Sequence, residues 1–147
     1  MKAQLRILCA FVLLALACSA RPPRAVDITA VNYAFQAPAT LPPGPAVFRL
    51  VNAGSVPHEV QLFLLKAGIG ADSGRALLRQ EHPPDSLADS SGAVLIAAPH
   101  TTAPELIYVD LQPGRVYALL CQFRDSAKAP RHSQLGMFGV LQVSGRP

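Results

Sequence analysis

The chain has 147 residues, which suits one domain with a sizeable core, and half of them are hydrophobic. Only 15% are charged, against roughly a quarter in ordinary soluble proteins, and the formal net charge is +4. This balance argues against a disordered chain and against a nucleic-acid partner. Fourteen prolines and ten glycines, with almost no long helical pattern, favour a turn-rich all-β protein.

Residues 1–20 have the pattern of a secretory signal peptide. Lys2 and Arg6 precede an apolar run that is too short to span a membrane as a helix. A second interpretation concerns the tripeptide Leu-Ala-Cys at 16–18, which resembles a bacterial lipoprotein box with Cys18 as the lipidated residue. We therefore expect an exported, periplasmic or otherwise extracytoplasmic protein, which is either cleaved and free or joined to a membrane only through a lipid anchor at Cys18.

Export changes the interpretation of the cysteines. Cys9 lies within the signal and Cys18 at its end, so Cys121 is the only cysteine expected in the folded domain. Exported domains normally pair their cysteines in disulfides. A solitary thiol is therefore either an inert, buried side chain or a ligand for a metal.

The rest of the chain predicts a Greek-key β-sandwich of about seven to eight strands. Residues 21–26 are interpreted as an N-terminal tether and 27–147 as the domain, with a proline-rich turn at 38–46. Alternating or dense apolar segments predict strands at 26–35, 47–51, 57–65, 93–97, 105–111, 115–121 and 137–143. The apolar density of 115–121 is typical of a central strand.

The alternation stops between residues 66 and 92, which we interpret as an inserted loop. Its glycines follow no strand of a βαβ unit and make no dinucleotide-binding fingerprint. A short helical piece is expected at about 73–79. No internal repeat or second domain is indicated.

Three potential metal ligands cluster near the C-terminus. Cys121, His132 and Met137 place a thiol, an imidazole and a thioether within seventeen positions, where one predicted strand ends and the next begins. These are ligands that copper prefers. His58, at the head of the strand at 57–65, offers a second imidazole. Taken singly, each residue has an ordinary explanation as a surface histidine, a core methionine or a buried thiol.

Together these residues resemble a known family. Cys121, His132 and the pair Gly136-Met137 before an alternating strand, with Asn52-x-Gly54…His58-x-Val60 upstream, resemble the cupredoxins, the blue copper family of plastocyanin and azurin. The resemblance implies one mononuclear type 1-like copper held by His58, Cys121, His132 and Met137. One feature departs from the family pattern, because the ten residues between Cys121 and His132 are longer than its usual loop.

The resemblance also implies a function. It predicts a one-electron carrier, not an enzyme, that passes electrons between a redox protein donor and acceptor. His132 would present its ring edge near the surface beside Pro130, Leu135 and Phe138. The basic residues of the loop, Arg124, Lys128 and Arg131, would either favour an acidic partner or belong to an ordinary solvated loop. Two alternatives stay open: a protein that stores, delivers or senses copper, and a metal-free sandwich that serves as an interaction domain.

Overall fold

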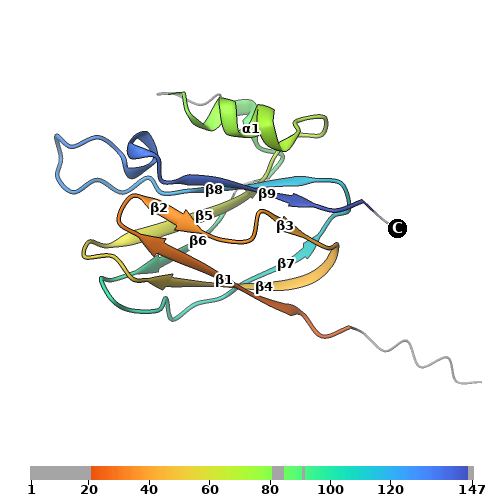
Figure 1. Cartoon of the computed structure of the whole chain (residues 1–147), viewed down its shortest axis with the longest axis horizontal. Helices are drawn as coiled ribbons and strands as arrows, with labels where there is room; N and C mark the ends of the chain where they lie inside the picture. The colour runs from red at the N-terminus through yellow and green to blue at the C-terminus, as the bar shows by residue number, and fades with distance from the viewer. Residues whose placement is uncertain (1–20, 81–84, 91, 146–147) are drawn as a thin grey trace, which may run out of the picture.

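The computed structural model describes residues 21–80, 85–90 and 92–145. The predicted signal peptide, with Cys18, lies outside the described residues. Two β-sheets pack face to face, and one α-helix lies outside them (Figure 1). The prediction of an all-β sandwich is confirmed. In the part of the chain that the structure covers, no helix has the length and apolar character needed to cross a membrane.

The described residues form nine strands, one α-helix and two 3₁₀ turns. In chain order they are β1 (Arg24–Val31), β2 (Ala34–Gln36), β3 (Thr40–Leu41), β4 (Gly44–Asn52), β5 (His58–Leu64), α1 (Ala71–Leu78), η1 (Asp85–Leu87), β6 (Ala93–Ala97), β7 (Ile107–Leu111), β8 (Val116–Leu120), η2 (His132–Leu135) and β9 (Phe138–Val143). One sheet has the order β2-β1-β4-β7 and the other β3-β9-β8-β5-β6. Neighbouring strands are antiparallel except β1–β4 and β3–β9.

Strand β8 shows why the five-stranded sheet is rigid. All five of its residues are buried, and it lies between β9 and β5, as the dense apolar segment predicted. Tyr117 and Leu119 face the core between the sheets, whereas Val116, Ala118 and Leu120 face a second apolar cluster. Since both faces are covered, the strand needs no polar alternation.

The insertion at 66–92 supplies that second cover. Helix α1 lies over β8 and β9 (Figure 1), and its Leu78 is buried against the outer face of the sheet. The end of the segment is fastened to the sheet at Asp89, whose amide donates to the Leu64 carbonyl at 2.9 Å and whose carboxylate accepts from Arg115. The expected helical piece at 73–79 is confirmed; it begins two residues earlier and ends one residue earlier than predicted.

Three predicted boundaries were wrong. The tether at 21–26 ends at residue 23, because Arg24 starts β1, which pairs with β4 and buries Val26. The single strand at 26–35 is a hairpin, because Asn32 adopts a φ of 45° and β2 folds back on β1. The proline-rich turn at 38–46 contains β3 and the start of β4.

Candidate metal centre

The ends of three neighbouring strands bring the predicted ligands to one end of the sandwich. His58 is the first residue of β5, Cys121 directly follows β8, and Met137 directly precedes β9. The Cys121 amide donates to the Met137 carbonyl at 3.2 Å, which extends the β8–β9 ladder by one step. His132 opens η2, the short blue helical turn of the loop between these strands (Figure 1).

Three ligand atoms converge at this end. His58 Nδ1 lies 3.2 Å from His132 Nδ1, and Cys121 Sγ lies 3.5 Å from the same His132 nitrogen. One donor atom from each residue falls within 4.8 Å of the others, and the three side chains are buried. The prediction that His58, Cys121 and His132 lie together is therefore confirmed.

The separations fit a single bound metal ion. An imidazole nitrogen lies about 2.0 Å and a thiolate sulfur about 2.3 Å from a bound metal such as zinc. With angles of about 105–110° at the metal, two such nitrogens are about 3.2–3.3 Å apart, and a nitrogen and the sulfur about 3.4–3.5 Å. Two imidazoles and one thiolate in this arrangement are the donor set of a mononuclear copper site.

Met137 lies beside this group. It is completely buried and belongs to the same apolar cluster as Cys121. Its amide donates to the His132 carbonyl at 2.9 Å, and its carbonyl accepts from the Cys121 amide. The backbone thus ties Met137 to two members of the group, while its role as a metal ligand stays a prediction.

The surroundings of Cys121 favour a thiol in the absence of a cation. Burial raises the pKa of Cys121, and hydrogen bonds from the Glu59 and Phe123 backbone amides partly oppose this effect. The Glu59 side chain is itself buried and accepts hydrogen bonds from the Gln122 amide (2.9 Å) and the Gln61 side chain (3.1 Å). A cation at the centre would offset the negative charge that gathers here.

His58 is held by packing and by its neighbouring turn. Burial, with the nearby His132, holds its pKa below the ordinary value, and its Nε2 has no hydrogen-bond partner among the described residues. Gly54 lies against this edge, where a Cβ would come within 3.1 Å of His58 Nε2. Asn52 fixes the turn by donating to the carbonyls of Val56, Ala97 and Ala98 and by accepting from the Gly54 amide.

His132 is held by hydrogen bonds instead. Its Nε2 lies 3.0 Å from an oxygen of Asp125, whose other oxygen accepts from the Tyr33 hydroxyl at 2.6 Å. The pKa of Asp125 is lowered, first by the Tyr33 hydrogen bond and then by that of His132. The Tyr33 ring also meets the His132 ring edge to face, with centroids 5.1 Å apart. The expectation of an exposed His132 edge was wrong, since only 1% of the residue is accessible.

The loop between Cys121 and His132 closes at its base. The His132 amide donates to the Phe123 carbonyl at 2.8 Å, and the Ser133 amide donates to the Cys121 carbonyl at 2.9 Å. Arg131 donates to the Gln122 side chain at 2.9 Å. The extra length is thus an excursion: residues 124–131, which include Asp125, extend from a loop whose two ends are joined by hydrogen bonds.

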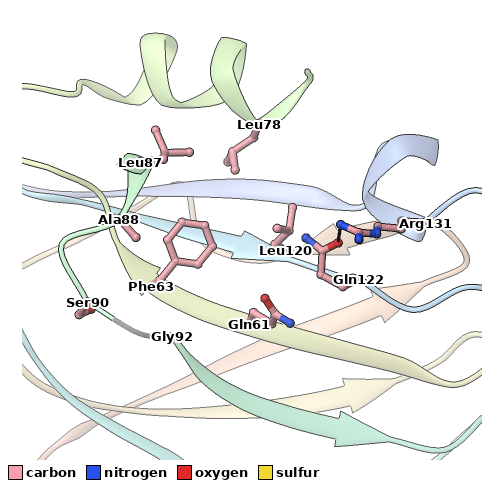
Figure 2. Close-up of a pocket in the computed structure, with 10 residues that line it drawn as sticks. All are labelled: Gln61, Phe63, Leu78, Leu87, Ala88, Ser90, Gly92, Leu120, Gln122 and Arg131. Atoms are coloured by element: carbon pink, nitrogen blue, oxygen red, sulfur yellow. Dashed lines mark hydrogen bonds between the residues drawn. The ribbon is translucent and has the colours of Figure 1, made fainter. Parts of the chain in front are cut away.

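Two hollows flank the centre. One, of about 440 Å³, is lined by Val56 and Pro57, which precede His58, and by Phe123, Arg124 and Asp125 of the loop before His132. The other, of about 300 Å³, lies between α1 and the sheet, with Leu78, Leu87 and Phe63 on its walls and the hydrogen-bonded Gln122–Arg131 pair at one end (Figure 2). This second hollow has both apolar and polar walls and marks where the insertion covers the sheet incompletely.

Comparison with solved structures agrees with this architecture. Reduced auracyanin from the photosynthetic bacterium Roseiflexus castenholzii matches with a TM-score of 0.53 at 22% identity, over 82% of this chain and 96% of that one. The chain has a cupredoxin fold. Auracyanin B matches with a TM-score of 0.55 at 19% identity, over 84% of this chain and 91% of that one. No protein-family model and no curated protein matches the sequence.

No structural role was predicted from the sequence for four side chains that shape this centre within the cupredoxin fold. They are Tyr33, Asn52, Glu59 and Asp125. Asn52 carried a local signal, as an Asx residue two positions before a glycine, which is typical of a side chain that closes a turn on its own backbone. The pairing of Tyr33 with Asp125 spans 92 positions and leaves no local pattern.

Proposed function

We propose that this protein is an exported one-electron carrier with one mononuclear, type 1-like copper held by His58, Cys121, His132 and Met137. The observation that carries the proposal is the convergence of two Nδ1 atoms and one sulfur, all from buried residues, at one end of the sandwich. Bound copper would supply a one-electron couple. The chain's own residues keep the donors fixed, exclude water and limit rearrangement between the two oxidation states.

The sandwich supports each part of this role. Cys121 and Met137 continue a β ladder, and His58 begins the central strand β5. Of the two imidazoles, His132 lies nearer to solvent, because the half-exposed carboxylate of Asp125 is its hydrogen-bond partner. We propose that a redox protein docks over the hollow lined by Val56, Pro57 and Phe123, beside this carboxylate.

A visible spectrum of the copper-loaded protein tests the function. A strong Cu(II)–thiolate band that a mild reductant bleaches and an oxidant restores supports the electron carrier. The band should vanish in Cys121→Ser, while Ser133→Ala, on the same loop, should retain it. Tight Cu(I) binding without this band indicates storage, delivery or sensing instead, and a folded protein that binds no copper refutes the copper site.

The proposed location has its own test. The secretory pattern at 1–20 and the lipoprotein-like tripeptide at 16–18 support export to the periplasm or another extracytoplasmic space, with or without lipidation of Cys18. The mass of the mature protein purified from its membrane and soluble fractions separates a lipid-modified N-terminal Cys18 from a free N-terminus. An intact, uncleaved chain would contradict export.

A further inference from the structure

We propose that Asp125 is the positioning residue of His132: its carboxylate holds the ring with Nε2–H toward the loop and Nδ1 toward the metal, and Tyr33 holds the carboxylate in turn. This inference rests on the copper site proposed above. It assigns a role to the long loop between Cys121 and His132, which is the main departure of this sequence from the cupredoxin pattern.

The two oxygens of Asp125 have different partners. One lies 3.0 Å from His132 Nε2, and the other accepts from the Tyr33 hydroxyl at 2.6 Å. An ionised carboxylate can only accept hydrogen bonds, so the Nε2 that faces it must carry the proton of a neutral imidazole. The lone pair of His132 is then on Nδ1, the atom that lies 3.2 Å from His58 Nδ1 and 3.5 Å from the sulfur. The carboxylate thus selects the tautomer that a metal requires.

The contact between Asp125 and His132 differs from an ordinary contact between surface side chains. His132 is only 1% exposed, and its ring meets the rings of both Tyr33 and His58 edge to face. Asp125 reaches it from an excursion whose base is already closed by the His132–Phe123 backbone bond. A loop that needed only to return His132 to the centre could omit residues 124–131. The excursion adds the carboxylate.

The arrangement has two consequences that can be separated. The hydrogen bond fixes the orientation of the ring, which should slow the release of copper, since removal of such outer partners typically weakens metal binding by about 10–100-fold. The negative charge of Asp125, one hydrogen bond away from a ligand, favours the more positive Cu(II) form. It should therefore lower the reduction potential.

Three variants separate these consequences. Asp125→Ala removes both the acceptor and the charge, Asp125→Asn removes the charge but retains an oxygen that can accept from Nε2–H, and Tyr33→Phe removes only the bond that holds the carboxylate. Asp110→Asn is the matched control, because Asp110 is an exposed aspartate of β7 and its replacement makes the same change in net charge.

Two measurements on copper-loaded protein are compared, the rate of copper release to a chelator and the reduction potential. We expect release to accelerate on the order of tenfold in Asp125→Ala, less in Asp125→Asn and Tyr33→Phe, and not at all in Asp110→Asn. The potential should rise equally in Asp125→Ala and Asp125→Asn, and less in Tyr33→Phe. Wild-type release and potential in Asp125→Ala would overturn the proposal.

A third measurement needs no copper. Imidazole ¹⁵N chemical shifts of the copper-free protein should show His132 as the Nε2–H tautomer, and Asp125→Ala should shift it toward a mixture. An unchanged tautomer in Asp125→Ala overturns this inference. Failure of the wild-type protein to bind copper refutes the proposed function instead, and the tautomer still decides the role of Asp125.

Discussion

The two imidazoles of the metal centre have the same chemistry and different supports. His58 begins a central strand, is completely buried, and its Nε2 has no hydrogen-bond partner in the described part of the chain. His132 lies in a loop, is equally buried, and its Nε2 is bound to Asp125. Packing orients the first ring, whereas a hydrogen-bond chain orients the second.

Because their supports differ, the two histidines should respond differently to mutations around them. The turn beside His58 is closed by Asn52, which also contacts the backbone after β6, so it is part of the folded core. The support of His132 is Asp125, a half-exposed side chain that is itself held by the Tyr33 hydroxyl. We therefore expect changes on the His58 side to lower the stability of the protein, and changes on the His132 side to alter the metal centre without unfolding it.

Asn52→Ala should have the largest effect on stability. Asn52 is 1% exposed, and its removal would leave the Val56, Ala97 and Ala98 carbonyls and the Gly54 amide without these partners. We expect the free energy of unfolding to fall by about 2–4 kcal/mol. Urea denaturation of the copper-free protein measures it. Asp125→Ala, the matched change on the other side, removes the acceptor of His132 Nε2 and of the Tyr33 hydroxyl, but it should cost less than Asn52→Ala because water can reach this half-exposed position. Equal losses would contradict the division.

Gly54→Ala should have a smaller effect and act directly on the His58 ring. A Cβ at this position would come within 3.0 Å of the Asn32 amide and 3.1 Å of His58 Nε2. One of these groups must move, and such overpacking costs about 1–3 kcal/mol. The urea midpoint and the fraction of copper bound should both fall.

Gly145→Ala is the control for this variant, because a Cβ there would meet nothing within 4 Å. If Gly54→Ala unfolds like Gly145→Ala and binds copper as the wild-type protein does, the turn does not hold His58.

The same division explains what the sequence could predict. The strand-end positions of His58, Cys121 and Met137 were predictable because each borders a segment whose apolar pattern marks a strand. His132, in the loop, was identified only through its residue type and the cupredoxin-like order of the ligands. The continuous apolar run of β8 predicted a central strand, and the sheet order confirms it. In each case the information is local, carried by residue type and by position within one strand.

Other features depend on distant parts of the chain. The burial of Val26 follows from its pairing with Phe48, and no pattern in 21–26 marks that pairing. The sharp turn at Asn32 interrupts an alternation that otherwise predicts one strand, although asparagine is among the residues that tolerate a positive φ. The turn also decides where Tyr33 lies, and hence its hydrogen bond with Asp125.

The smallest expected effect is the pH dependence of stability, which should distinguish His58 from Asp125. The pKa of His58 is held below its ordinary value of 6.5, so the unfolded chain binds a proton there that the folded chain resists. The stability of the copper-free protein should therefore be fully present above pH 6.5. It should fall as the pH drops further, by at most about 1.4 kcal/mol per pH unit. The pKa of Asp125 is also lowered, from 3.8, so its contribution is lost only below that value.

Urea midpoints measured between about pH 7 and pH 4.5 test this separation, because the window includes the ordinary pKa of histidine and lies above that of Asp125. His58→Gln should flatten the profile below pH 6.5, since the side chain that resists protonation is gone. Asp125→Asn should leave the slope in this window unchanged. A slope that persists in His58→Gln would assign it to another group, and a slope that disappears in Asp125→Asn would mean that the carboxylate and His58 do not act separately. Either result would contradict the conclusion that packing holds His58 while a separate hydrogen bond holds His132.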